Sequence, residues 1–219
     1  MRAIVGGEAL PLDLAKELVS ICGEVWNLYG PTEGTVAATV WQVPTDVNQI
    51  LIGTPLANYR VYVLDPGMQL VPVGVPGELY IGGVGVARGY RNRPELTAER
   101  FVADPFSGEP GARLYRSGDR VRFRDDGTLE FMGRLDDQVK IRGFRIELGE
   151  IETQLRKCDE IKDAVVAVLE SKRKSSEIVC KEDKYLCAYI VFNDDKQLSI
   201  WEIKQYLSSR LPDYMIPSY

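Results

Sequence analysis

The spacing of apolar residues predicts a mixed α/β chain. Short apolar runs predict strands, and apolar residues three or four apart predict helices. A buried strand is expected at residues 3–5 and a helix at 13–22, with Leu14, Leu18 and Ile21 on one face. Two further strands are expected at 24–28 and 36–43.

Between residues 50 and 89, glycine and proline break the pattern into short strands at 59–64 and 77–81. This spacing indicates a small barrel or a distorted β region. Pro94 opens a short helix that runs through Phe101. Strands at 114–116 and 121–124 flank a turn at Gly118-Asp119. Asp126-Gly127 then predicts a hairpin into a strand at 129–132.

The pattern of apolar and polar residues changes after Asp136. Expected elements are a strand at 139–141, a helix at 147–158, a strand at 164–169, a charged loop at 171–183, a strand at 185–192 and a helix at 199–211. Ile151 and Leu155 form the apolar face of the first helix, and Ser199 with Glu202 fits a capping box at the start of the second. The sequence therefore predicts two parts, 1–136 and 137–219, the second a compact α+β lobe.

The composition excludes several kinds of chemistry, and it says less about the fold. The 219 residues include no histidine, which removes the commonest general base and metal ligand. None of the cysteines, at 22, 158, 180 and 187, form a CxxC pair, so we expect free thiols in a reducing, cytoplasmic setting rather than a zinc knuckle. The net charge of -5 and the lack of a long apolar run argue against a nucleic-acid surface and a membrane span.

The chain opens directly into a strand pattern, which predicts that it is a piece of a longer protein, cut inside a domain. A parallel strand at that position would lack neighbours on both sides.

The first stretch of candidate functional residues is Asn27–Glu33, at the end of a predicted strand. Gly30 permits a positive φ or a close backbone approach, and Pro31 fixes the turn. Thr32 and Glu33 then present a hydroxyl and a carboxylate that suit a phosphate oxygen and its magnesium ion. Tyr29 offers a flat face for stacking a base. A plain turn with a solvated glutamate is the alternative.

Ser117–Asp119 and Phe131–Asp136 form a second polar stretch. The Asp119 carboxylate can accept two hydrogen bonds, which matches the vicinal hydroxyls of a ribose, although an aspartate capping its own turn is the commoner use. Arg134 can reach ribose or phosphate oxygens, and Phe131 can pack near the base. Asp136 lies where a hinge is expected. A salt bridge between Arg134 and Asp136 is the alternative.

A third stretch, Lys140–Arg145, places three cations around Gly143. Strand alternation turns Lys140 and Arg142 to one face, and Gly143 allows a close backbone approach. A solvated strand edge protected by positive charge is the alternative. The Gly82-Gly83-x-Gly85 run is a weak match to a dinucleotide-binding loop, because no clear helix follows it.

Taken together, five segments in order resemble the adenylation domains of nonribosomal peptide synthetases, within the adenylate-forming superfamily of acyl- and aryl-CoA ligases and luciferase. They are NLYGPTE at 27–33, GELYIGGVGVARGYRNRPELTAERF at 77–101, LYRSGD at 114–119, GRLDDQVKIRGFRIELGEIE at 133–152 and LPDYMIP at 211–217. The resemblance implies the C-terminal part of a large subdomain, a sheet plus a distorted barrel, at 1–136. It implies a small C-terminal subdomain at 137–219.

The resemblance also implies a reaction. An amino-acid carboxylate attacks the α-phosphate of ATP, pyrophosphate leaves, and the acyl group passes to the phosphopantetheine thiol of a peptidyl carrier domain. By resemblance, catalysis involves Thr32, Glu33, Arg134 and Lys140, with Glu33 as the Mg²⁺ ligand and Asp136 as the hinge. The implied nucleotide site is Asn27, Tyr29, Gly30, Thr32, Asp119, Phe131 and Arg134. Arg142 and Gly143 belong to the loop of the thioester-forming state, and the implied amino-acid pocket is Ile4, Gly6, Leu28, Val36 and Ala37.

The family's phosphate loop, the pocket aspartate and the adenylation lysine have no counterpart in the 219 residues. The resemblance therefore implies that the isolated chain does not catalyse adenylation and needs the preceding part of the domain. A freestanding acyl-CoA ligase and a non-catalytic carrier-docking module are the alternatives.

Overall fold

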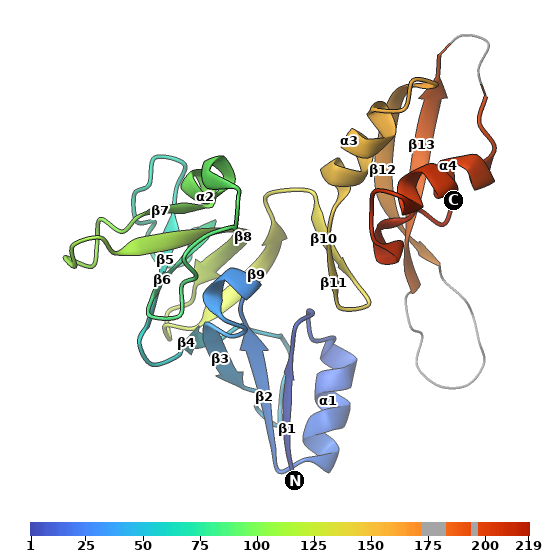
Figure 1. Ribbon diagram of the computed structural model, residues 1–219. Coiled ribbons are helices and arrows are strands. Elements are labelled where there is room, and N and C mark those ends of the chain that lie inside the picture. Colours follow the sequence, from blue (N-terminus) through green and yellow to red (C-terminus); the bar gives the residue numbers. More distant parts are fainter. Residues whose placement is uncertain (172–182, 194–196) are drawn as a thin grey trace. The chain divides into compact units, whose positions relative to one another are not determined.

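The computed structural model describes residues 1–171, 183–193 and 197–219, and Figure 1 shows the order of their elements. The chain divides into two compact units, Met1–Asp136 and Asp137–Tyr219. No helix among the described residues combines the length and apolar character that a membrane crossing requires.

Unit 1 begins with a four-stranded sheet in the order β1-β2-β3-β4. Its strands are β1 (Arg2–Gly6), β2 (Glu24–Tyr29), β3 (Thr39–Gln42) and β4 (Thr54–Pro55), and β1 runs parallel to β2. Helix α1 (Leu12–Ile21) packs on one face of this sheet, where Ala15 and Val25 are buried in a shared core. The helix at 13–22 and the strand at 24–28 are thus confirmed to within a residue.

Three sequence expectations for this sheet are wrong. The strand at 3–5 is not buried, because β1 pairs with β2 alone and Ile4 lies 69% exposed on the face opposite α1. The packing side of α1 is formed around Ala15, so Leu14 and Ile21 are exposed. The strand predicted at 36–43 begins only at Thr39, since Thr35 and Val36 have positive φ values that end extended structure.

The second sheet of unit 1 forms the distorted β region that the glycine and proline spacing predicts. Strands β5 (Tyr59–Leu64), β6 (Gly77–Gly83), β8 (Arg113–Phe123) and β7 (Phe101–Ala103) are neighbours in that order, and β9 (Leu129–Arg134) pairs with β8. Helix α2 (Pro94–Arg100) precedes β7. The hairpin at Asp126-Gly127 is confirmed, with β8 and β9 on either side.

The described residues of unit 2 form two hairpins, two α-helices and a short 3-10 helix, η2 (Asp213–Met215). Strands β10 (Gln138–Ile141) and β11 (Phe144–Glu147) form the first hairpin, and β12 (Ile161–Ser171) and β13 (Asp183–Phe192) the second. Helices α3 (Leu148–Arg156) and α4 (Ile200–Ser208) contribute Ile151, Leu155 and Leu207 to one core. That core also holds one face of the second hairpin, and the Ser199–Glu202 capping box is formed. The predicted loop at 171–183 falls largely outside the described residues.

Candidate nucleotide site

The turn after β2 owes its shape to a close approach of backbone to backbone. A Cβ added at Gly30 would lie 2.7 Å from both the Ala37 Cα and the Ala38 nitrogen. Among the two reasons that the sequence offers for Gly30, the close approach is therefore the one that applies. The Ala38 N–H donates to the Tyr29 carbonyl at 2.8 Å and closes the loop. Asn27, two residues earlier, is buried and donates to the Leu51 carbonyl at 2.8 Å.

This turn directs Tyr29 toward the middle of β8. The Tyr29 hydroxyl donates to the Asp119 carboxylate, and the Arg134 Nη1 donates to the same carboxylate at 2.5 Å. Burial raises the pKa of Tyr29 well above its ordinary value, and the charge of Asp119 raises it further. Tyr29 therefore remains a protonated donor at neutral pH. Residues 90 positions apart in the sequence meet here, so the fold builds one polar cluster from two separate motifs.

Arg134 links that cluster to the end of unit 1. Its Nε donates to Asp136 Oδ1 at 2.6 Å and its Nη2 to Asp136 Oδ2 at 2.8 Å, so the salt bridge that the sequence left as an alternative is present. Arg100 approaches the same carboxylate at 3.8 Å. Side-chain exposure is low at Arg134 (17%) and Asp119 (8%), which strengthens these interactions relative to a solvated pair.

The turn predicted at Gly118-Asp119 is wrong in form. Strand β8 runs continuously through these residues, and Gly118, with a φ of 76°, sits in an irregularity of the ladder. A glycine with positive φ serves a bulge as readily as a turn, and the sequence alone does not separate the two. Asp119 therefore faces Tyr29 and Arg134 and does not cap a turn of its own.

Glu33 forms a second contact, four residues after Tyr29. Its side chain is buried, which excludes the solvated alternative, and its Oε1 accepts a hydrogen bond from the Tyr90 hydroxyl at 2.5 Å. Burial, and then the bond to Glu33, raise the pKa of Tyr90. Thr32 opens the short 3-10 helix η1 (Thr32–Gly34) and is exposed. Sequence reasoning missed Tyr90, although it lies within the quoted motif at 77–101.

The donor set around Glu33 suits magnesium only in part. In the described part of the chain, no three His, Cys, Asp or Glu side chains gather into a metal cage. Mg²⁺ is usually held by one or two carboxylates together with substrate phosphates, and the buried Glu33 carboxylate beside the exposed Thr32 fits that pattern.

The aromatic residues assigned to a base lie in one region. The rings of Tyr29 and Phe131 are 6.4 Å apart between centroids and tilted by 40°, so they are neighbours without being stacked. Phe131, on β9, is 36% exposed. Phe131 thus lies beside the tyrosine that bonds to Asp119, and the roles of both rings toward a base stay predictions.

The predicted amino-acid pocket is distributed along the exposed face of the first sheet and the turn that follows. Ile4, Gly6 and Leu28 share that face, because Gly6 pairs with Leu28 and Ile4 lies two residues before Gly6. Val36, with a φ of 72°, is 81% exposed and Ala37 is half-buried. A φ above zero is rare for a β-branched residue, so the turn holds Val36 in a strained geometry.

The basic residues of the stretch Lys140–Arg145 lie in unit 2. Arg142 and Gly143 have φ values of 53° and 82° and form the two-residue turn between β10 and β11. Two consecutive positive φ values are typical of a type I′ hairpin. The expectation that Lys140 and Arg142 share a strand face is therefore wrong, because the strand ends at Ile141.

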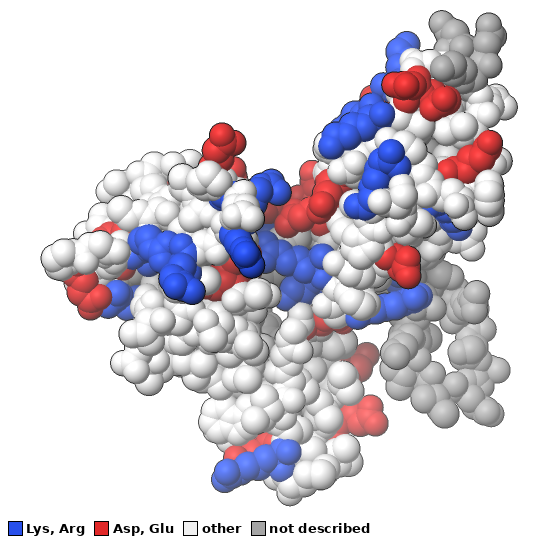
Figure 2. All heavy atoms as spheres, in the orientation of Figure 1, with Lys and Arg blue, Asp and Glu red and all other residues white. Residues whose placement is uncertain are grey.

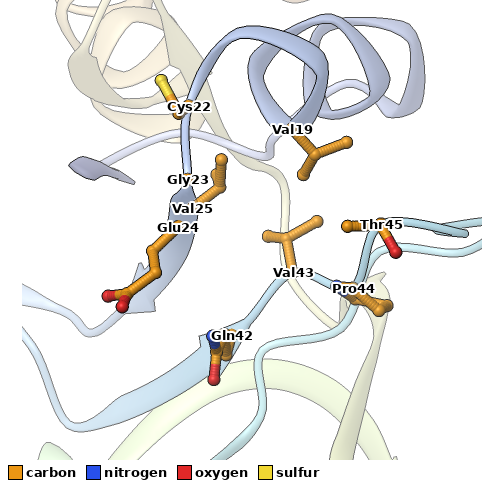
Figure 3. Close-up of a pocket in the computed structure, with 9 residues that line it drawn as sticks. All are labelled: Val19, Cys22, Gly23, Glu24, Val25, Gln42, Val43, Pro44 and Thr45. Carbon is orange, nitrogen blue, oxygen red and sulfur yellow. The ribbon is translucent and has the colours of Figure 1, made fainter. Parts of the chain in front are cut away.

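Two cavities in unit 1 lie away from the cluster. One, of about 250 Å³, is bounded by the end of α1, the start of β2 and the residues after β3, as Figure 3 shows. It is at the opposite end of β2 from Tyr29, and its one acidic lining residue, Glu24, is paired with Arg2 at 2.9 Å. The other, of about 270 Å³, adjoins the Arg60–Glu109 pair. Neither is lined by Tyr29, Asp119 or Arg134.

Several charged side chains elsewhere in unit 1 form ion pairs. On the face shown in Figure 2, basic and acidic groups are interspersed and do not form a surface of one sign. Pairs such as Arg116–Glu78 at 3.0 Å and Arg122–Glu130 at 2.9 Å lie on the second sheet of unit 1.

Comparison with known proteins finds relatives that match the whole chain. Residues 1–91 match the family model described as AMP-binding enzyme. The dimodular nonribosomal peptide synthase of Bacillus subtilis is 50% identical over 100% of this chain, which spans 9% of that protein. Tyrocidine synthase 3 of Brevibacillus parabrevis is 48% identical over 99% of this chain, which spans 3% of it. The chain thus spans a small part of the length of the curated relatives it matches.

Two solved structures extend the comparison. Holo-AB3403, a four-domain nonribosomal peptide synthetase bound to AMP and glycine, is 48% identical with a TM-score of 0.59, over 100% of this chain and 16% of that one. PA1221, a nonribosomal peptide synthetase protein containing adenylation and PCP domains, is 30% identical with a TM-score of 0.79, over 99% of this chain and 42% of that one.

The fold and the matches are those of AMP-binding enzymes. More particularly, the chain is similar over its whole length to nonribosomal peptide synthetases, and its fold matches the C-terminal portion of an adenylation domain.

Proposed function

We propose that this chain forms the ribose-binding and hinge-proximal part of a site that activates an amino acid with ATP. The carboxylate oxygen of the amino acid attacks the α-phosphorus, the bond to the β-phosphate oxygen breaks, and pyrophosphate leaves. The thiol sulfur of phosphopantetheine on a carrier domain then attacks the carbonyl carbon of the aminoacyl-adenylate. The bond from that carbon to the phosphate oxygen breaks, the acyl group becomes a thioester, and AMP leaves with loss of the thiol proton. The observation that carries the proposal is the convergence of Tyr29 and Arg134 on Asp119.

The cluster can bind a nucleoside while it keeps its own contacts. Tyr29 bonds to one oxygen of Asp119 and Arg134 to the other. Each carboxylate oxygen can accept more than one hydrogen bond, so both oxygens can also accept from ribose hydroxyls. The ring of Tyr29 and the nearby Phe131 supply aromatic surface for adenine. Holo-AB3403, which carries AMP and glycine, supports this class of ligand.

The chemistry fits a chain without histidine, because positioning and charge stabilisation accelerate this reaction more than acid or base catalysis does. In the proposal Thr32 contacts the adenylate phosphate, and Glu33 holds the Mg²⁺ that neutralises phosphate charge when bound. Lys140, Arg142 and Gly143 serve the thioester-forming state, with Asp136 as the hinge between residues 1–136 and 137–219.

The amino-acid side of the site is also part of the proposal. Ile4, Gly6, Leu28, Val36 and Ala37 are all small or apolar. These residues favour an apolar substrate side chain.

The test is amino-acid-dependent ATP–pyrophosphate exchange in the complete polypeptide in which residues 1–219 are translated. We expect exchange with one or a few amino acids. Asp119→Ala should lower kcat/KM by about 100-fold, because a charge-assisted contact to the nucleotide is lost. The control is Asp46→Ala, at an exposed aspartate outside the cluster, with less than about twofold effect.

Two outcomes would contradict the proposal. Exchange that depends on fatty or aryl acids and coenzyme A, with no amino acid active, would favour a freestanding acyl-CoA ligase. Failure to bind AMP, together with retained binding of a carrier domain, would favour a non-catalytic docking module.

A further inference from the structure

The ladder between β6 and β8 contains a large irregularity beside Asp119. Glu78 pairs with Arg120 and Tyr80 pairs with Arg116, so Leu79 alone faces the three residues Ser117, Gly118 and Asp119. Extra residues on one strand leave backbone groups without ladder partners and bend the strand. The conformation of this bulge sets the direction in which the Asp119 carboxylate points.

Side chains replace the missing ladder bonds on the β6 side. Glu78 Oε1 accepts a hydrogen bond from the Gly118 N–H at 3.1 Å. The Ser117 hydroxyl donates to the Leu79 carbonyl at 2.7 Å and accepts from the Asp119 N–H at 3.0 Å. All three bonds are buried, so each removes an otherwise unsatisfied polar group.

Glu78 is itself fixed in place. Arg116 Nε lies 3.0 Å from both of its oxygens, and the residue is 9% exposed. Its carboxylate therefore has little freedom to leave Gly118. On the other side of the bulge, the Gly118 carbonyl accepts from the Leu135 N–H at 2.8 Å and the Ser117 carbonyl accepts from Arg134 Nη2 at 3.1 Å.

We propose that Glu78, with Ser117, is a positioning residue for the nucleotide site. It touches no substrate atom and acts by holding the bulge so that Asp119 meets the ribose hydroxyls. The inference rests on the proposed function, since it gives Asp119 the ribose as its ligand. Without the Glu78 acceptor, the buried Gly118 N–H is unsatisfied and the bulge relaxes, which turns the carboxylate away from its ligand.

The experiment compares AMP with 2′,3′-dideoxy-AMP, because only AMP carries the hydroxyls that Asp119 is proposed to bind. Dissociation constants are measured by calorimetry on the complete polypeptide. Glu78→Ala should weaken AMP binding about tenfold and leave the dideoxy nucleotide within about twofold, since one well-placed hydrogen bond is lost. Glu78→Gln should retain AMP binding within about threefold, because its amide oxygen still accepts from Gly118.

The chain offers a matched control in Glu130→Ala. Glu130 pairs with Arg122 at 2.9 Å on the same sheet, with side-chain exposures of 13% and 40% against 10% and 45% for Glu78 and Arg116. Loss of this pair should change neither nucleotide by more than about twofold. Ser117→Ala removes the acceptor of the Asp119 N–H and should also weaken binding of AMP but not of 2′,3′-dideoxy-AMP. This variant replaces Glu78→Ala in the experiment if Glu78→Ala does not fold.

The outcomes separate the inference from the function beneath it. A wild-type protein that binds both nucleotides equally would remove the ribose role of Asp119, and with it that part of the proposed function. If the wild type prefers AMP and both Glu78→Ala and Ser117→Ala keep that preference, the positioning role alone is overturned. Equal weakening of both nucleotides by these variants would also overturn it, as general destabilisation.

Discussion

At the scale of single residues, the site depends on polar groups that the fold removes from water. Asp119, Glu33 and Ser117 are all less than 9% exposed, and each has a hydrogen-bond partner contributed by a distant segment. The sequence identified Asp119 and Glu33 as carboxylates of interest. It could not identify Tyr90 as the partner of Glu33, because neither spacing nor residue type links positions 33 and 90.

Half-buried Tyr29 makes the stability of the protein decrease at alkaline pH. Its pKa is raised in the folded state, chiefly by burial and then by Asp119. The unfolded chain therefore loses this proton near pH 10 while the folded chain keeps it. The contribution is complete below pH 10 and declines as the pH rises above it, by up to about 1.4 kcal/mol per pH unit.

Urea unfolding at about pH 9 and about pH 11 measures this dependence, because these values lie on either side of the ordinary tyrosine pKa. Tyr29→Phe should be less stable than the wild type at the lower pH by about 1 kcal/mol, through the lost hydrogen bond. It should also lose less stability between the two pH values. Identical losses in both proteins would show that Tyr29 ionises normally.

At the scale of elements, the strands were predicted more reliably than their irregularities. The alternating and β-branched runs at 59–64 and 77–81 became β5 and β6. The segment at 113–123 became a single strand, where the sequence predicted two strands and a turn. Gly118 permits both outcomes, and the bulge forms because Glu78, Ser117 and Leu135 make hydrogen bonds to its backbone.

Gly118→Ala tests the bulge directly. The residue has a φ of 76°, and an added Cβ would lie 2.7 Å from both Arg134 Nη2 and Asp136 Oδ2. These two atoms bond each other, so neither can move without weakening the pair. We expect a loss of about 3 kcal/mol in the free energy of unfolding and weaker AMP binding.

Gly127→Ala is the control for backbone strain alone. Gly127 has a φ of 80° at the β8–β9 hairpin, with no heavy atom within 4 Å of an added Cβ. Urea unfolding should show a loss of about 1 kcal/mol in the free energy of unfolding. Calorimetry should show unchanged AMP binding. Equal effects of the two substitutions would show that the contacts around Gly118 contribute nothing.

At the scale of the whole molecule, each unit has a core of its own. The core of unit 2 contains Ile151 and Leu155 of α3 and Leu207 of α4, together with one face of β12 and β13. The other face of that hairpin carries Val165, Tyr189 and Val191, each more than half exposed. A unit with a separate core is expected to fold without the other.

Excision of residues 137–219 tests this expectation. The fragment should unfold cooperatively in urea, and Leu155→Ala should lower its free energy of unfolding by about 3 kcal/mol, because a fully buried side chain leaves a cavity. Val165→Ala, on the exposed face, should change it by less than about 0.5 kcal/mol. A fragment without a cooperative transition would contradict the independence of unit 2.

By itself, the sequence determined most of the helices and strands, a change in residue pattern after Asp136, and the motif residues that resemble those of an adenylate-forming chain. These properties are local, because they follow from spacing, turn chemistry and residue type within a few positions. Tertiary structure alone decided that Tyr29 and Arg134 meet at Asp119, that Glu33 is buried against Tyr90, and that Gly118 lies in a bulge. Each of these depends on pairing between strands far apart in the chain, and a hydrogen bond across such a distance has no signature in local spacing.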